Sequence, residues 1–447
     1  MEAKTPVASR PSLHRELNLF DAIAVVVGTT IGSGIFIVPS MIAVRLHSFA
    51  AVLLVWLAGG LLTLCGALSL GELGAMYPGS GGVCTYLYQA YGPATAFLYA
   101  WALLFMIHSG SIAALGIAFG LYVGQIVHLG LIQQKIISVV CILTLTALSC
   151  LGIRGSKLVQ NLVAAAKISG LAGIIVLLCW KGSRPIHLLG LVGSDGDGVS
   201  FAGLGVALVA VLWVYEGWHV ISFVAGEMKQ PQRDLPRSLF YGSATVMLIY
   251  ALANVGYYHV LPPRQIRGSE AVAALAVGTL LGPIATSCIS LLILISTLGS
   301  MNGLILTGPR VYYSMAHDGI FPRPFAQINA RYRTPMVALI VQGVWAAVLA
   351  ASGSYQRLFT DVIFTAWIFY GLAVAAVLVL RHNEPQRERP FFVPVYPWLP
   401  LLFCAAATGL VLSTVLQQPA NALTGICLVA AGLPVYFYLT KSLPMER

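Results

Sequence analysis

Long apolar runs are the feature that most constrains how this chain can fold. About 20 consecutive apolar residues can cross a bilayer as a helix, and twelve such runs occur in the 447 residues. They are approximately 19–46, 49–77, 94–127, 136–153, 159–180, 201–226, 239–261, 276–315, 336–352, 358–380, 397–417 and 421–440. Only 9% of the residues are charged, whereas soluble domains carry about 25%. The sequence therefore predicts an all-α integral membrane protein with 12 transmembrane helices, in which the long eighth run tilts or continues as a helix into water.

The distribution of Lys and Arg predicts the orientation of these spans. Twelve spans place both termini on one side, and basic residues are enriched in cytoplasmic segments. With the N-terminus inside, inner segments carry seventeen of the 25 Lys and Arg, outer segments carry seven, and Lys167 lies within a span. We expect residues 1–16 to form a cytoplasmic tail and both termini to be cytoplasmic in a cell (inner) membrane. The net charge of +10 then reflects topology and not nucleic-acid binding.

The first span contains the glycine-rich stretch Gly28–Phe36. Each glycine costs a helix about 1 kcal/mol relative to alanine. An unwound turn inside a bilayer is tolerated only where protein or a water-filled cavity takes its backbone N–H and C=O groups. The glycines and Ser33 indicate either a close packing face between helices or a broken helix whose freed amides face an anionic group of a substrate.

A second interruption lies near the centre of the sixth span, within Trp213–His219. Matching interruptions in two halves of a membrane protein indicate a transporter built from an inverted repeat. We expect one transmembrane domain over residues 17–447, with repeats at about 17–180 and 201–381. Two further helices at about 397–440 follow the second repeat.

Several motifs together resemble one transporter family. They are Gly32–Phe36 with Pro39, Gly71–Pro78, Val159-Gln160 with Lys167, Tyr215 with Gly217-Trp218, Gly226–Arg237 and Gly299–Gly303. This set is similar to the L-amino acid transporter family of the amino acid–polyamine–organocation superfamily, over about residues 17–389. The resemblance implies a LeuT-like 5+5 inverted repeat with discontinuous helices 1 and 6. It also implies an alternating-access carrier.

The resemblance also implies a substrate site at the two interruptions. The substrate carboxylate would meet the amides of Gly32, Ser33 and Gly34. Its ammonium would meet carbonyls near both breaks, and Trp213 would cover the site. The implied substrate-binding set is Thr30, Ile31, Gly32, Ser33, Gly34, Trp213, Tyr215 and Glu216.

Three side chains are candidates for coupling or selectivity. Lys167, an expensive charge inside a span, either snorkels to the interface or, as in similar carriers, stands where sodium sits in sodium-coupled relatives. Tyr257 matches a family tyrosine that bridges toward Lys167 or the first break, although a packed aromatic is an equal interpretation. Glu216 replaces the Gly of several animal members. It either pairs with a donor such as His219 or acts on the substrate ammonium or on a proton.

These observations predict a sodium-independent carrier, an exchanger of neutral L-amino acids that acts by alternating access and prefers small side chains. The open alternatives are a proton symporter that uses Lys167 or Glu216, and a carrier of cationic amino acids or polyamines. The sequence holds no clustered nucleophile or metal set and no phosphate-binding loop, so we expect no enzyme activity and no cofactor. The loop at 128–135 lacks the Cys that links animal members to a heavy chain. We therefore expect a bacterial member without a disulfide-linked heavy chain, whose partners are a small-molecule amino acid substrate and the lipid bilayer.

Overall fold

The computed structural model describes residues 15–79, 81–152, 156–185, 201–269 and 271–442. Side chains are described throughout these ranges except at 156–164, 201–202 and 441–442. The predicted N-terminal tail lies outside the described residues, apart from its last two positions.

The described helices follow the predicted order of twelve spans. The first half contains α1 (Leu19–Thr30) and α2 (Gly34–Arg45), α3 (Phe49–Met76), α4 (Val83–Tyr91), α5 (Pro93–Ala102), the π-helix η1 (Leu103–Ile107), α6 (His108–Val127), α7 (Leu131–Cys150) and α8 (Ser156–Lys181). The second half contains α9 (Phe201–Val214), the 3₁₀-helix η2 (Trp218–Glu227), α10 (Pro231–Val260), α11 (Pro263–Arg267), α12 (Val272–Leu281), α13 (Pro283–His317), the 3₁₀-helix η3 (Arg323–Ala326), α14 (Met336–Ser352) and α15 (Tyr355–Asn383). Two further helices follow, α16 (Trp398–Gln417) and α17 (Pro419–Ser442). Within the described residues, nine helical stretches are long and apolar enough to cross a membrane, and α1 with α2 makes a tenth, broken span.

The eighth apolar run differs from its prediction as one long helix. Gly282 adopts φ +86°, a backbone conformation that glycine favours, and Pro283 begins a new helix directly after it. The run is therefore divided into the short helix α12, which packs against α13, and α13 itself. Hydropathy alone could not locate this turn, because the apolar character continues through it.

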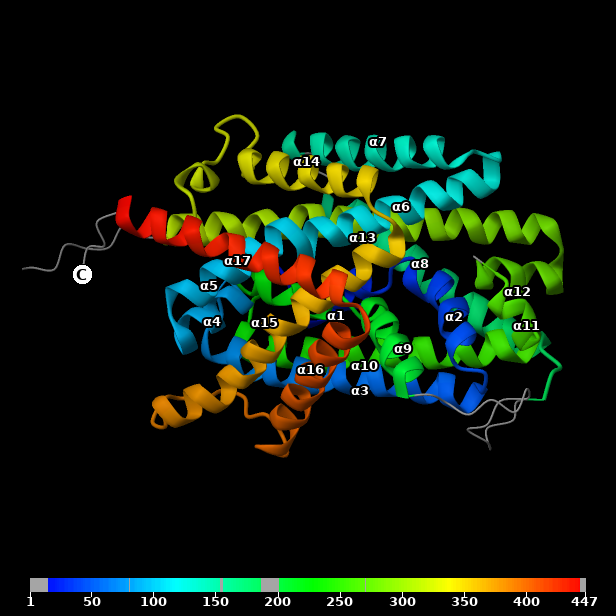
Figure 1. The fold of residues 1–447 in the computed structure, drawn as a ribbon, viewed down its shortest axis with the longest axis horizontal. Coiled ribbons are helices and arrows are strands. Elements are labelled where there is room, and N and C mark those ends of the chain that lie inside the picture. The colour runs from blue at the N-terminus through cyan, green and yellow to red at the C-terminus, as the bar shows by residue number, and fades with distance from the viewer. Residues whose placement is uncertain (1–14, 80, 153–155, 186–200, 270, 443–447) are drawn as a thin grey trace, which may run out of the picture.

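The two broken spans cross at the centre of the molecule (Figure 1). Helix α1 contacts η2, and α2 contacts α9, so the two broken spans run in opposite directions. Helices α3, α10 and α13 run along the long axis of the molecule, and α7 pairs with α14 on one side (Figure 1). The antiparallel crossing is the arrangement that the predicted inverted repeat requires.

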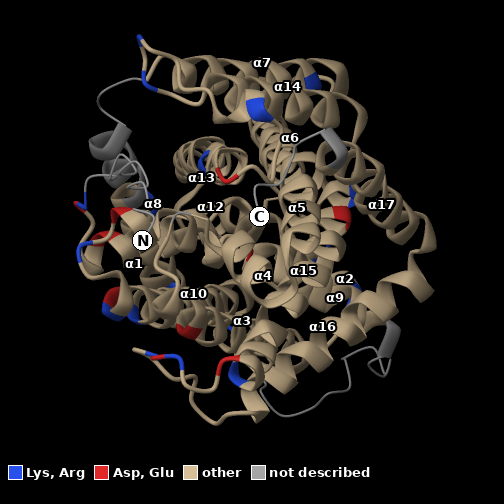
Figure 2. Cartoon of the chain, turned by 90° about the vertical axis from the view of Figure 1, so that its left-hand side faces the viewer, with Lys and Arg blue, Asp and Glu red and all other residues tan. Residues whose placement is uncertain are grey.

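Most of the Lys, Arg, Asp and Glu residues coloured in Figure 2 lie on loops and helix ends around the rim of the bundle. The most buried charge at such a helix end is Glu72 of α3, which is 1% exposed. Its carboxylate accepts hydrogen bonds from Arg381 Nε at 2.8 Å, from Arg381 Nη2 at 2.6 Å and from the Val393 backbone N–H at 2.7 Å. Arg389 Nε lies 3.5 Å from the same carboxylate. This cluster links the end of α3 to the end of α15 and to the connection before α16.

We predict that Glu72→Gln destabilises the protein. The substitution leaves Arg381 and the buried Arg389 without their anion, and breaking a buried ion pair typically costs about 3–5 kcal/mol. Thermal unfolding of the detergent-purified protein measures the effect. Glu388→Gln, the same change at an exposed residue of the same connection, is the matched control and should leave the midpoint unchanged. Equal midpoints for both variants would contradict the role of this cluster.

Candidate functional site

The first break lies in the glycine-rich stretch that the sequence singled out. Helix α1 ends at Thr30, α2 begins at Gly34, and their axes are bent by 46°. In the described part of the chain, the backbone N–H groups of Gly32, Ser33 and Gly34 have no hydrogen-bond partner. Unpaired amides at a helix N-terminus favour an anion. The break therefore offers a site for a carboxylate.

The second break faces the first. Helix α9 ends at Val214, and η2 begins after Gly217, which adopts φ +111°. A Cβ atom at Gly217 would lie 2.9 Å from the Thr29 carbonyl oxygen, so only glycine fits this crossing. The Thr29 hydroxyl lies 3.1 Å from the Gly217 carbonyl oxygen. The Tyr250 hydroxyl lies 3.1 Å from the Thr30 carbonyl and 3.0 Å from the Val214 carbonyl. Side chains and backbone thus hold the two breaks together.

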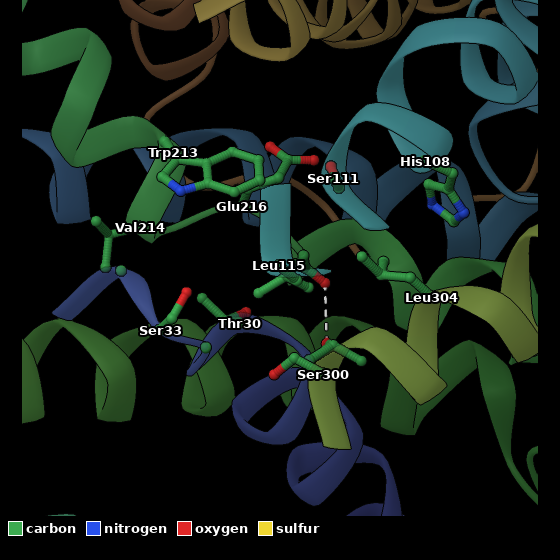
Figure 3. A pocket seen from close by; sticks show the side chains of 14 residues that line it. Thr30, Ser33, His108, Ser111, Leu115, Trp213, Val214, Glu216, Ser300 and Leu304 are labelled. Atoms are coloured by element: carbon green, nitrogen blue, oxygen red, sulfur yellow. Dashed lines mark hydrogen bonds between the residues drawn. The ribbon is translucent and has the colours of Figure 1, made fainter. Parts of the chain in front are cut away.

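A cavity of about 40 Å³ lies between the breaks (Figure 3). It is lined by Thr29, Thr30, Gly32, Ser33, Gly34, His108, Ser111, Leu115, Trp213, Val214, Glu216, Gly217, Ser300 and Leu304. This volume holds a few water molecules, so the cavity must widen to admit an amino acid. Six of the eight predicted substrate-binding residues line it, namely Thr30, Gly32, Ser33, Gly34, Trp213 and Glu216.

The other two predicted residues do not line the cavity. The Ile31 carbonyl accepts hydrogen bonds from Lys167 and from Ser300. The Tyr215 ring packs against Trp56, and its hydroxyl donates to the Trp56 carbonyl at 3.1 Å. Residues in a turn point in different directions. Their position in the sequence next to a break therefore does not show whether they line the cavity.

Lys167 reaches the first break from α8. Its ammonium donates to the Gly28 carbonyl at 2.5 Å, to the Ile31 carbonyl at 2.9 Å and to the Ser300 hydroxyl at 2.9 Å. The side chain is 1% exposed, so it does not snorkel toward the membrane surface. The positive charge lies at the C-terminal end of α1, where the helix dipole favours a cation.

Tyr257 of α10 lies on the other side of the same break. Its hydroxyl is 3.4 Å from the Ile35 carbonyl oxygen, in the first turn of α2. It therefore contacts the half-helix beyond the break. Its hydroxyl is not one of the three oxygen atoms that accept a hydrogen bond from Lys167. Its role in coupling stays a prediction.

Trp213 and Glu216 connect the second break to α15. The Trp213 indole N–H donates to the Tyr355 hydroxyl at 2.9 Å, and its ring stacks on Phe359 with centroids 6.1 Å apart. The Tyr370 hydroxyl donates to the Glu216 carboxylate at 2.6 Å. Figure 3 shows Trp213 and Glu216 on the same side of the cavity, away from Ser33 and Thr30.

Sequence reasoning missed the contributions of α6 and α13 to the cavity. His108, Ser111 and Leu115 lie one turn apart on α6, and Ser300 and Leu304 lie one turn apart on α13. The spacing of these residues fits one helix face, but such faces recur along every buried helix. Only the Gly299–Gly303 motif had drawn attention to this part of α13. Among the described residues, no group of three or more His, Cys, Asp or Glu could hold a metal ion.

This chain is similar in sequence to known proteins of one family. The model of the amino acid permease family matches residues 17–432. The serine/threonine exchanger SteT of Bacillus subtilis (strain 168) is 32% identical over 96% of this chain and 98% of its own length. The human b(0,+)-type amino acid transporter 1 is 32% identical over 95% of this chain and 88% of its own, and the human cystine/glutamate transporter is 29% identical over 97% and 86%.

The match covers nearly the whole chain and includes both breaks, the lysine that reaches the first of them and the cavity between them. The matching family and these relatives are transporters and not enzymes. The chain therefore belongs to the amino acid permease family, as a multi-span membrane transporter with the LeuT-like fold.

Proposed function

We propose that this protein is a sodium-independent exchanger of neutral L-amino acids that works by alternating access. The observation that carries the proposal is that one small cavity is lined both by the unpaired backbone amides of Gly32–Gly34 and by the carboxylate of Glu216. A free amino acid is a zwitterion, so its site must offer donors to one end and acceptors to the other. Amides at a half-helix N-terminus supply the donors. Glu216 and the carbonyls of the breaks supply the acceptors.

The position of Lys167 supports sodium independence. Three oxygen atoms surround its ammonium at 2.5–2.9 Å. Carbonyl and hydroxyl oxygens at the end of an unwound helix are also the ligands that a monovalent cation uses in transporters. The Lys167 ammonium occupies this oxygen cluster, so the first break does not need a bound sodium ion to keep its shape.

The charges of the site support a neutral substrate. Lys167 and Glu216 carry opposite formal charges, and a zwitterion adds none. A cationic amino acid or a polyamine would leave a net positive charge in the membrane interior, which is costly. SteT is named as a serine/threonine exchanger, which favours exchange and a small neutral substrate. The small cavity under Trp213 favours the same class.

We propose further that the protein acts as a single chain in the cell membrane, with both termini cytoplasmic. The excess of Lys and Arg in the inner segments supports this orientation. The described end of α17 lies toward the same end of the bundle as the end of α15 (Figure 1), the helix whose Arg381 pairs with Glu72, which fits that topology. The missing Cys at 128–135 supports a protein without a disulfide-linked heavy chain.

Exchange is tested by uptake of radiolabelled L-serine into proteoliposomes. We expect rapid uptake only when the vesicles are preloaded with an amino acid, because an exchanger returns to the outside only with substrate bound. Replacing sodium by choline on both sides should leave the rate unchanged. Uptake into unloaded vesicles that follows a proton gradient would favour the proton-symport alternative, and loss of uptake in choline would contradict sodium independence.

Lys167→Gln should lower the exchange rate by tenfold or more. The substitution removes the cation and leaves the buried Gly28 and Ile31 carbonyls short of a donor, and each such group costs about 1–3 kcal/mol. Lys181→Gln, at the far end of the same helix, is the matched control and should exchange like the wild type. Exchange by Lys167→Gln at the wild-type rate, with the same amount of protein in the vesicles, would contradict the role of the ammonium.

Competition by unlabelled amino acids tests the substrate class. We expect L-alanine, L-serine and L-threonine to inhibit labelled L-serine exchange strongly, because their side chains fit beneath Trp213. L-leucine should inhibit more weakly, and L-arginine and polyamines should not inhibit. Strong inhibition by L-arginine would favour the cationic-substrate alternative, with Glu216 as its counter-charge.

A further inference from the structure

Three titratable side chains from two elements and the second break meet beside the cavity. The Tyr370 hydroxyl lies 2.6 Å from Glu216 Oε1, and it lies 3.1 and 3.2 Å from Nδ1 and Nε2 of His219. The His219 Nδ1 atom is 3.7 Å from the Glu216 carboxylate. Tyr370 is fully buried, His219 is 1% exposed, and Glu216 lines the cavity. We call Glu216, Tyr370 and His219 the carboxylate triad.

The carboxylate triad has no fixed positive charge beside it. Among the described residues, no Lys or Arg lies within ion-pair distance of Glu216. The ammonium of Lys167, the cation at the first break, is engaged by Gly28, Ile31 and Ser300. A buried carboxylate without a counter-charge is costly. The triad must therefore be neutralised by a proton or by a positive group of the substrate.

The geometry lets the carboxylate triad gain or lose a proton without moving a heavy atom. When Glu216 is ionised, the Tyr370 hydroxyl donates to it, and a ring N–H of neutral His219 can donate to the Tyr370 oxygen. When Glu216 carries a proton, it can donate to the Tyr370 oxygen, and the Tyr370 hydroxyl turns toward an unprotonated nitrogen of His219. The Tyr370 hydroxyl has an acceptor in both states, and the two states differ by one proton.

Other titratable groups face the carboxylate triad from the surrounding helices. His108 of α6 has its ring centroid 6.5 Å from that of His219, and neither of its ring nitrogens has a hydrogen-bond partner. Tyr99 of α5 interacts electrostatically with Glu216, and also with Cys84 of α4 and Tyr312 of α13. In their ordinary neutral forms, none of these four groups supplies a charge that would balance Glu216.

We propose that the carboxylate triad is a proton site in the wall of the substrate cavity, and that a proton and the substrate ammonium compete for it. The inference rests on the proposed function, because it takes the substrate to be an amino acid. With Glu216 ionised, its charge attracts the ammonium. With a proton on the triad, that attraction is lost. Substrate binding then releases a proton, and the affinity for a neutral amino acid falls as the pH falls.

The pH dependence of exchange tests the proton site. KM for L-serine is measured in preloaded proteoliposomes with the same pH on both sides, from about pH 5.5 to about pH 8.5. A single competing proton changes an apparent affinity by at most about tenfold per pH unit. For the wild type we expect KM to rise as the pH falls. Glu216→Gln keeps the shape of the side chain but cannot ionise, so its KM should not depend on pH. Tyr370→Phe removes the connecting hydroxyl and should shift the pH at which KM rises. His317→Asn, at an exposed histidine at the end of α13, is the control and should keep the wild-type profile.

Proton release gives a second readout that does not depend on transport. Isothermal titration of the purified full-length protein with L-serine, in two buffers of different ionisation enthalpy, counts the protons released. We expect release of a fraction of a proton, up to one, for the wild type, and none for Glu216→Gln. A KM that does not change with pH, or a Glu216→Gln variant that keeps the wild-type profile, would overturn the proton site while leaving exchange intact. Absence of L-serine exchange at every pH would instead overturn the proposed function and the proton site with it.

Discussion

The rest of this structure depends on the hydrogen bonds that hold the backbone groups of two interrupted helices inside a bilayer. Lipid offers no hydrogen-bond partner, so backbone groups released at an unwound turn must find one within the protein. Here Thr29 contacts the Gly217 carbonyl, and Tyr250 contacts a carbonyl from each break. The amides of Gly32–Gly34 are the groups left over. The same constraint that holds the breaks together therefore also creates the binding site.

Two buried charges of opposite sign flank that site, and their partners differ in kind. Carbonyl and hydroxyl oxygens surround Lys167 and accept hydrogen bonds from its side chain. Among the described residues, Tyr370 and His219 lie beside Glu216, and neither carries a fixed charge. Lys167 contacts the end of α1 through these hydrogen bonds. In the function proposed above, Glu216 responds to what enters the cavity, and a neutral zwitterion leaves the sum of the two charges unchanged.

The sequence predicted the backbone of the site better than its walls. Glycine reports directly on backbone conformation, so Gly28–Phe36 and Gly217 marked both breaks. A buried lysine is so costly in a bilayer that Lys167 was identifiable without coordinates. Ser111 and Leu304 carried no such signal, because small polar and apolar residues occur throughout buried helices. The division at Gly282 was hidden for a related reason: hydropathy averages over a window, whereas one residue with a positive φ is enough to end a helix.

Helix α15 contacts the second broken span at two levels along its length and α3 at a third. Near its beginning, Tyr355 accepts a hydrogen bond from Trp213, and in its middle Tyr370 donates to Glu216. At its end, Arg381 pairs with Glu72 of α3. The contact at Glu216 lies between the other two, beside the cavity. If Glu216 is the proton site proposed above, its neutralisation replaces the charged acceptor in the middle one of these three contacts by a neutral group.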